Sequence, residues 1–172
     1  MARRVGRKRC ARKKERAAET DRARISIVGT MNVTVRIAQA PDLNRIRTAY
    51  EAWGYQGGMK AEDTAWLAEV ANGLIGVVRV APENGTLVLR GMRIAEEWRR
   101  RGIGTRMLRR VGEWLCKREC YCVPYAHLTG FYGQIGFVEV TTGATPSFLA
   151  KRLTEYRRRA LDVAILVRPA NI

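Results

Sequence analysis

The sequence predicts one α/β domain of the α+β type. Three observations lead to this prediction. Short apolar stretches with strand-like alternation take turns along the chain with longer stretches of helical spacing. Three consecutive strands are joined by two Asn-Gly turns, which favour tight antiparallel hairpins. The last of these strands, at residues 86–94, leads into a glycine-containing turn and then into an amphipathic helix.

The elements are expected in the order β-α-β-β-β-α-β-α-β-α-β, without an internal repeat. The first strand alternates Val33, Val35 and Ile37 with polar residues, and Pro41 and Asp42 start the helix that follows. The expected elements are strand 33–39, helix 41–53, strands 64–70, 74–80 and 86–94, a helix after the turn at 102–104 that runs to about 117, strand 120–123, a short helix at 126–134, strand 136–142, helix 146–159 and strand 161–167.

The composition is that of an ordinary water-soluble domain. The chain has 172 residues, of which 47% are hydrophobic and 28% charged, so one domain with a sizeable core is expected. The longest apolar runs are too short to span a bilayer, and no apolar segment follows the basic N-terminus as in a signal peptide. We therefore expect no membrane association and a cytoplasmic protein, which would be organellar instead if residues 1–30 were a transit peptide.

The charge is distributed unevenly. The net charge is +16, and residues 1–30 contribute half of it with 11 Lys/Arg and 3 Asp/Glu. We expect residues 1–30 to be a disordered or weakly helical basic tail and residues 31–172 to be the folded domain. The tail is also compatible with a nucleic-acid-binding arm, and the alternative that translation starts at Met31 stays open. A field of this sign favours polyanions or anionic small molecules.

The four cysteines do not predict a metal site. Three of them lie in the segment "CKRECYC", whose spacing differs from the usual zinc pairs, and His127 is the only histidine of the chain. Without a secretion signal a disulfide framework is not expected either. We expect buried or half-buried thiols and no metal.

The turn "RRRGIG" has the properties of a pyrophosphate-binding loop. Glycines allow close approach of the backbone, and the free N–H groups of a helix start attract an anion. Arginine side chains neutralise its charge. A dinucleotide fingerprint is excluded because Met107 stands where its third glycine is required, and a P-loop is excluded because its Gly-Lys-Ser/Thr is absent.

With these features the sequence resembles the GNAT superfamily of acyl-CoA N-acyltransferases. The pattern Arg99-x-x-Gly102-x-Gly104 is similar to the acetyl-CoA motif of that family, and "FYGQIGF" at 131–137 is similar to its tyrosine and Gly-Phe signature. The resemblance covers residues 33–168. It implies a mixed, mostly antiparallel sheet flanked by helices, and direct transfer of an acetyl group from acetyl-CoA to a primary amine in a ternary complex, without a metal.

The resemblance also implies roles for individual residues. Met92, Arg93 and Ile94 would offer backbone groups to the pantetheine arm of acetyl-CoA. Tyr132 would be the catalytic acid that protonates the departing thiolate. The pyrophosphate would be wrapped by Arg99, Arg100, Arg101, Gly102, Ile103, Gly104 and Thr105.

Two positions depart from the family pattern. Tyr125 stands where many members have an asparagine, and Arg90 stands where many have a glutamate that acts as general base. The base is therefore unassigned among Glu51, Asp63, Glu69 and His127. Together with Arg79, Arg90 suggests an acceptor that carries a negative charge, unless both arginines pair with carboxylates or face solvent; Glu51 and His127 are further candidates for substrate contact.

A second hypothesis belongs to a different class. A protein on a catalytically inactive scaffold of this kind could bind nucleic acid through residues 1–30 and the Arg-rich helix. Aromatic residues make up only 8% of the chain and do not alternate with the basic runs, which argues against a stacking platform for single strands. The oligomeric state is expected to be monomer or homodimer.

Overall fold

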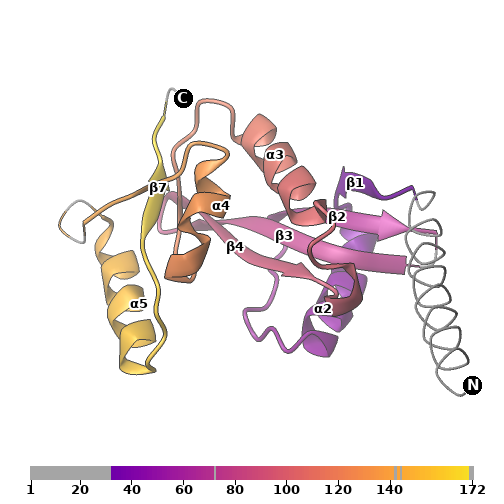
Figure 1. Cartoon of the computed structure of the whole chain (residues 1–172), viewed down its shortest axis with the longest axis horizontal. Helices are drawn as coiled ribbons and strands as arrows, with labels where there is room; N and C mark the ends of the chain where they lie inside the picture. Colours follow the sequence, from indigo (N-terminus) through magenta and orange to yellow (C-terminus); the bar gives the residue numbers. More distant parts are fainter. Residues whose placement is uncertain (1–31, 72, 142, 144, 171–172) are drawn as a thin grey trace, which may run out of the picture. The chain divides into compact units, whose positions relative to one another are not determined.

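A mixed sheet organises the part of the chain that the computed structural model describes, residues 32–71, 73–141, 143 and 145–170 (Figure 1). Within these residues the sheet has seven strands in the order β1-β2-β3-β4-β5-β7-β6, and only β4 and β5 pair in parallel. The strands are β1 (Thr34–Ile37), β2 (Thr64–Val70), β3 (Gly73–Glu83), β4 (Thr86–Ile94), β5 (Cys120–Cys122), β6 (Val138–Glu139) and β7 (Leu166–Arg168). The predicted fold class is confirmed.

Helices cover both faces of this sheet. On β2, Trp66 and Ala68 pack in one cluster of buried residues with α3, whereas Ala65 and Leu67 pack in another with α2. This alternation follows from the two-residue period of a strand. Figure 1 accordingly shows α3 above the strands and α2 below them. The helices are α2 (Leu43–Ala52), α3 (Ile103–Leu115), α4 (Thr129–Gly133) and α5 (Ser147–Arg158), with short 3₁₀ turns at Ala40–Asp42, Glu96–Trp98 and Ala126–Leu128.

The hairpin between β3 and β4 has the predicted turn. Asn84 and Gly85 both have positive φ angles, 48° and 76°, as a two-residue type I′ turn requires. The other expected turn includes Asn72, which lies outside the described residues. The predictions for residues 1–30 lie outside them as well.

Several predicted boundaries are wrong, among them those of the last two strands and of α3. The strand expected at 136–142 is reduced to β6, which pairs only with β7 at the edge of the sheet and leaves Val138 52% exposed. The strand expected at 161–167 becomes β7, three residues long, because Val163 bridges to Tyr125 before regular pairing begins. Helix α3 ends at Leu115 instead of about 117, since the next residue, Cys116, has a positive φ angle of 49°.

No helix in the described part of the chain is long and apolar enough to cross a membrane.

Candidate active site

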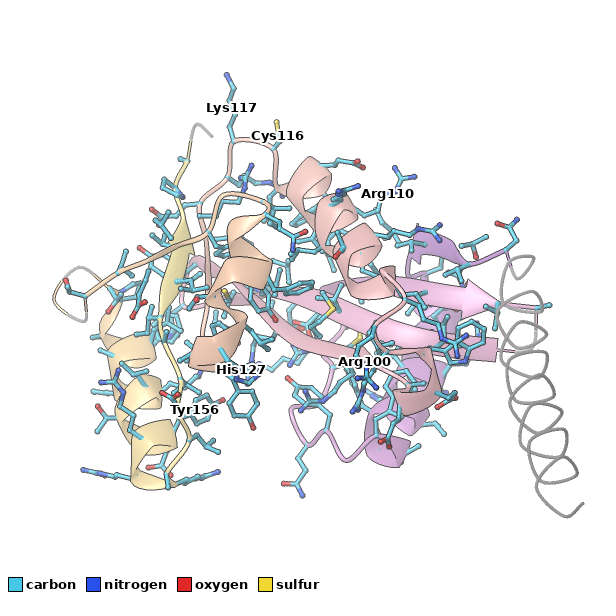
Figure 2. The ribbon with its side chains drawn as sticks, viewed as in Figure 1. Arg100, Arg110, Cys116, Lys117, His127 and Tyr156 are labelled. Atoms are coloured by element: carbon cyan, nitrogen blue, oxygen red, sulfur yellow. The ribbon has the colours of Figure 1, made fainter. Side chains whose placement is uncertain are left out.

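A large cavity opens where β4 and β5 separate. The two strands pair only through Val88–Tyr121 and Leu89–Cys122, after which β4 continues along β3 alone. The cavity has a volume of about 1060 Å³ and is lined by residues from β4, the turn before α3, α4, α5 and the segment 54–57. Arg100 and Tyr156 come to it from the α3 side and from α5 respectively, and Figure 2 shows them on opposite sides.

A bulge in β4 forms part of this wall. The register between β3 and β4 shifts between Val77 and Arg79, and Gly91 has a φ of +62° in the inserted stretch. The hydroxyl of Tyr50 donates a hydrogen bond of 2.9 Å to the Gly91 carbonyl, and a side chain at this position would place its Cβ 2.5 Å from that hydroxyl. Burial raises the pKa of Tyr50 far above its usual range, so the phenol remains a donor. Both the conformation and the space around the bulge therefore require glycine.

The turn before α3 has the conformation that its glycine pattern predicts. Gly102 has a φ of +74° and is the N-cap of α3, and Arg100 also has a positive φ of 59°. Arg106 N–H makes an early helical hydrogen bond, 3.1 Å, to the carbonyl of Gly102. The N–H groups from Gly102 to Thr105 have no acceptor within the helix, because the first four of any α-helix lack one. Four amides and the positive end of the helix dipole thus meet the cavity.

The structure brings nearly all residues of the predicted acetyl-CoA site together. Arg101 is the exception: it is exposed and lies over the Trp98 ring at 5.1 Å from the guanidinium carbon to the ring centroid. The predicted residues that line the cavity are Met92, Arg93, Ile94, Arg99, Arg100, Gly102, Ile103, Gly104 and Thr105.

Tyr132 lies on the same cavity wall and is otherwise buried. Its side chain is 6% exposed, and its ring meets Phe131 and Phe137 edge-on at centroid distances of 5.1 and 6.1 Å. Burial, with a smaller effect of the neighbouring Cys122, raises the pKa of the Tyr132 phenol well above its usual value. The group therefore keeps its proton at neutral pH. Tyr125 also lines the cavity, but it is 43% exposed and stacks on His127 at 5.7 Å between ring centroids.

None of the four proposed bases lines the cavity. Glu51 is exposed on α2, and His127 is exposed beside Tyr125. Asp63 is bound to Arg79 at 2.5 Å, and Glu69 accepts hydrogen bonds from Arg36. Among the described residues the cavity lining contains no aspartate, glutamate or histidine.

The two arginines expected at the acceptor site separate. Arg90 lines the cavity and donates to Glu83 Oε1 at 2.7 Å. Arg79 does not line it: its guanidinium group is buried, where it binds Asp63 and donates to the carbonyl of Gly57 at 2.9 Å. Arg79 therefore holds the 54–63 loop in place, and its expected contact with the acceptor is wrong. Both arginines pair with carboxylates, as the alternative had it, but Arg90 also lines the cavity.

Sequence reasoning missed the part of the wall that α5 contributes. Arg152, Tyr156 and Arg159 line the cavity, together with Tyr55 from the segment after α2. The three residues of the α5 segment recur at intervals of four and three, so they share one helix face. That periodicity was visible in the sequence, but only the fold shows that this face meets β4.

The three described thiols and the described carboxylates form no metal centre. Cys120 and Cys122 are buried on β5 and Cys116 is exposed. Burial raises the pKa of the Cys120 thiol to about 12. In the part of the chain that the structure describes, no group of three or more His, Cys, Asp or Glu side chains could hold a metal ion.

Comparison with protein families identifies the domain. Residues 61–139 match the family model described as the acetyltransferase (GNAT) domain. This segment, a little under half of the chain, is similar to the GNAT acetyltransferase domain. The matched segment includes β2 to β4, the glycine turn and Tyr132, so the family that the two motifs predicted is confirmed. No curated protein matches the sequence.

Solved structures have the same GNAT fold at low sequence identity. N-acetylglutamate synthase from Neisseria gonorrhoeae, complexed with coenzyme A and N-acetyl-glutamate, is 16% identical with a TM-score of 0.58. The match covers 82% of this chain and 36% of the synthase chain, so this chain spans about a third of the synthase. The ribosomal-protein-S18-alanine N-acetyltransferase from Escherichia coli is 15% identical with a TM-score of 0.58, over 82% of this chain and 96% of that one. Rv2747 from Mycobacterium tuberculosis, in complex with CoA and NLQ, is 15% identical with a TM-score of 0.57, over 81% and 99%.

Proposed function

We propose that this protein is an N-acetyltransferase that transfers an acetyl group from acetyl-CoA to a primary amine by direct attack in a ternary complex. One observation carries the proposal. The N-terminal amides of α3, the bulged half of β4 and the buried Tyr132 line a single cavity of about 1060 Å³. That volume is slightly above the usual range for small-molecule sites, about 300–1,000 Å³, and so leaves room for a long cofactor.

The turn before α3 fits a pyrophosphate. Arg99 and Arg100 line the cavity beside the free amides from Gly102 to Thr105, so charge and hydrogen-bond donors converge. Among the described residues, no atom outside its chain neighbours lies within 4 Å of the Cβ position at Gly102. The backbone there is open to an anion. Arg101 is directed to Trp98, and we leave it out of the binding site.

The strand beyond the bulge fits the pantetheine arm. From Met92 to Ile94, β4 pairs with β3 on one side and has lost β5 on the other. A chain with amide groups could bind to this free edge as an additional strand does, by hydrogen bonds to the backbone. The residue types matter little for such contacts, whereas the splaying of β4 and β5 is essential.

Tyr132 is the proposed proton donor. Acetyl-CoA supplies an acetyl thioester, which the amine attacks and from which the CoA thiol departs. Tyr132 Oη holds the proton that this sulfur takes up, because burial keeps the phenol protonated. Since no described carboxylate or imidazole lines the cavity, we propose that the amine reacts as the free base. Its nitrogen then loses one proton to water and keeps one N–H in the amide, while the Tyr132 phenolate regains a proton from water.

The first test is binding of acetyl-CoA, measured by thermal unfolding. A ligand that binds only the folded state stabilises it by about 2.7 kcal/mol at one hundred times its dissociation constant. Gly104→Val should remove this shift, because side-chain atoms would stand between the anion and the amides. A Cβ at this position lies 3.4 Å from Phe131, in ordinary contact, so the variant should fold.

A matched pair of arginine variants serves as control. Arg100 and Arg109 are both exposed, but only Arg100 lines the large cavity. We expect Arg100→Gln to weaken acetyl-CoA binding about tenfold or more and Arg109→Gln to leave it within twofold, since a charge-assisted contact contributes about 1.5–3 kcal/mol. Equal effects of the two variants, or an unchanged shift in Gly104→Val, would overturn the pyrophosphate assignment.

A further inference from the structure

The cavity wall is strongly basic and carries no compensating acid within it. Among the described residues, six arginines line the cavity and no aspartate or glutamate does. The six are Arg90, Arg93, Arg99, Arg100, Arg152 and Arg159. Two of them, Arg99 and Arg100, belong to the turn that we assign to the pyrophosphate. The other four exceed what that group needs.

Two of the four are held together away from the pyrophosphate end. Arg90 Nη1 donates to Glu83 Oε1 at 2.7 Å, and Arg152 Nη2 donates to Glu83 Oε2 at 2.5 Å. Burial raises the pKa of Glu83, but the hydrogen bonds from Arg152 and Arg90 outweigh it and the net shift is downward. Glu83 is therefore ionised, and each of its oxygens is engaged by one arginine.

This arrangement leaves charge and donors for a ligand. Two guanidinium groups and one carboxylate sum to one positive charge, and each guanidinium group has five N–H donors, of which the contact with Glu83 uses one. Glu83 itself does not line the cavity, whereas Arg90 and Arg152 do. The side chains are 25% and 22% exposed, so both are partly desolvated and fixed in position.

The position along β4 separates this arginine pair from the pyrophosphate end of the cavity. Arg90 precedes the bulge at Gly91 and lies two residues before Met92, the first proposed pantetheine contact. Ile94 is four residues further on than Arg90, roughly 13 Å at the rise of a strand. Arg152 comes from α5, as do Tyr156 and the arginine that follows at 159. The pair thus lies at the β4–α5 end of the cavity, where the acceptor must enter if the other end holds the pyrophosphate.

We infer that the acceptor is an amine that also carries a carboxylate, which Arg90 and Arg152 bind while Glu83 positions them. The inference rests on the proposed function and names the substrate class for it. Guanidinium groups match a carboxylate because they form paired, charge-assisted hydrogen bonds. The same field disfavours a polyamine or a lysine-rich segment, whose additional cations would be repelled.

Matched acceptors test this directly. The first arm compares free amino acids with their α-carboxamides, and the second compares short peptides that have Glu or Gln as their second residue. CoA release is measured with acetyl-CoA as donor. In one of the two comparisons we expect kcat/KM to be about 10- to 100-fold higher for the acid than for its neutral partner. This ratio corresponds to the free energy of a hydrogen bond between charged groups. The amine of a carboxamide loses its proton more readily than that of the free acid, so amine ionisation cannot produce this preference.

Variants separate acceptor binding from structural support. Arg152→Gln should raise KM for the acid about tenfold or more, whereas KM for the neutral partner should stay within twofold of the parent value. Arg157→Gln, exposed on the same helix and outside the cavity, should change neither. Glu83→Gln keeps both arginines but leaves only one acceptor oxygen to position them, so the preference for the acid should persist in weakened form.

Each other outcome counts against the inference. Equal turnover of acids and neutral partners, or equal losses for both in Arg152→Gln, would overturn it. If acetyl-CoA raises the melting temperature but no acid of either arm releases CoA, the anionic acceptor is wrong while the acetyl-CoA site stands. If acetyl-CoA does not bind, the proposed function fails and the acceptor inference fails with it.

Discussion

At the scale of single residues, Tyr132 combines a buried ring with a position on the cavity wall. Burial raises its pKa, so the phenol is a poor base and a stable proton reservoir at neutral pH. The free thiol of CoA is expected to have a pKa near 8.5, so its departing thiolate gains from a proton donor at pH 7. An acid is useful here without being indispensable.

We therefore expect Tyr132→Phe to lower kcat by about 10²-fold at pH 7, at the lower end of the range for general acid catalysis. Binding of acetyl-CoA should change little, because the ring and its contacts with Phe131 and Phe137 are kept. Steady-state kinetics at pH 7 and pH 9 measure the effect. Tyr125→Phe is the matched control, since Tyr125 also lines the cavity but is 43% exposed. If Tyr132→Phe stays within twofold while Tyr125→Phe loses more, the acid is Tyr125.

At the scale of elements, an ion network joins β1, β2 and α2. Arg36 on β1 donates to Asp42 at 2.6 Å and to Glu69 on β2 at 2.7 Å, and Arg45 on α2 contacts both carboxylates at 3.1 and 2.9 Å. Asp42 also accepts a hydrogen bond of 2.8 Å from the backbone N–H of Gln39. The hydrogen bond from Arg36, followed by that from Gln39, holds the pKa of Asp42 well below its usual range.

This network predicts an acid-sensitive contribution to stability. The pKa of Asp42 is lower in the folded state than in the unfolded chain, where it is about 3.9. As the pH falls below that value, the unfolded chain binds more protons than the folded protein, so the free energy of unfolding decreases. We expect Asp42→Asn to cost about 2 kcal/mol at pH 7, as for the loss of hydrogen bonds to a charged group, and the difference from the parent to shrink as the pH falls below 4. Urea unfolding at pH 7, 5 and 3.5 measures this.

Glu113→Gln is the control for this experiment. Its partner is Arg110 at 3.0 Å, and both side chains are about 60% exposed, so the pair is screened by solvent. We expect no measurable change in stability at any of the three pH values. A difference between Asp42→Asn and the parent that stays constant down to pH 3.5 would show that packing, and not the ionised carboxylate, accounts for the loss.

The sequence predicted those parts of the site that depend on neighbouring residues. Gly102 and Gly104 mark a turn by their own conformational freedom, and Tyr132 is part of a short signature, so local pattern was sufficient. Strand boundaries failed where pairing with distant segments decides them, as at β6 and β7. The sequence also could not show which of the two arginines, Arg79 or Arg90, lines the cavity. They are directly opposite each other on β3 and β4, and only the positions of Asp63 and Glu83 in the fold determine which one reaches the cavity.

At the scale of the whole molecule, the net charge is shared equally between two parts of very different length. Residues 1–30 and residues 31–172 each contribute +8 to the net charge. The six arginines of the cavity all belong to the second part, and the described clusters of buried apolar side chains consist of residues from Val33 onward. The arginine side chains that line the cavity are therefore all supplied by the second part.

We accordingly expect a chain that begins at Met31 to keep its melting temperature, its acetyl-CoA shift and its turnover within about twofold, because every proposed contact comes from residue 54 or later. Binding to duplex DNA, measured at 50 and 200 mM salt, should weaken strongly on deletion, since a basic segment binds phosphates by releasing counterions and that binding depends steeply on salt. A variant of the full chain with Arg99 and Arg100 replaced by Gln provides the converse control, with acetyl-CoA binding lost and DNA binding kept. If the chain from Met31 loses turnover but keeps its melting temperature, the tail takes part in acceptor binding, and residues 1–30 belong to the functional site.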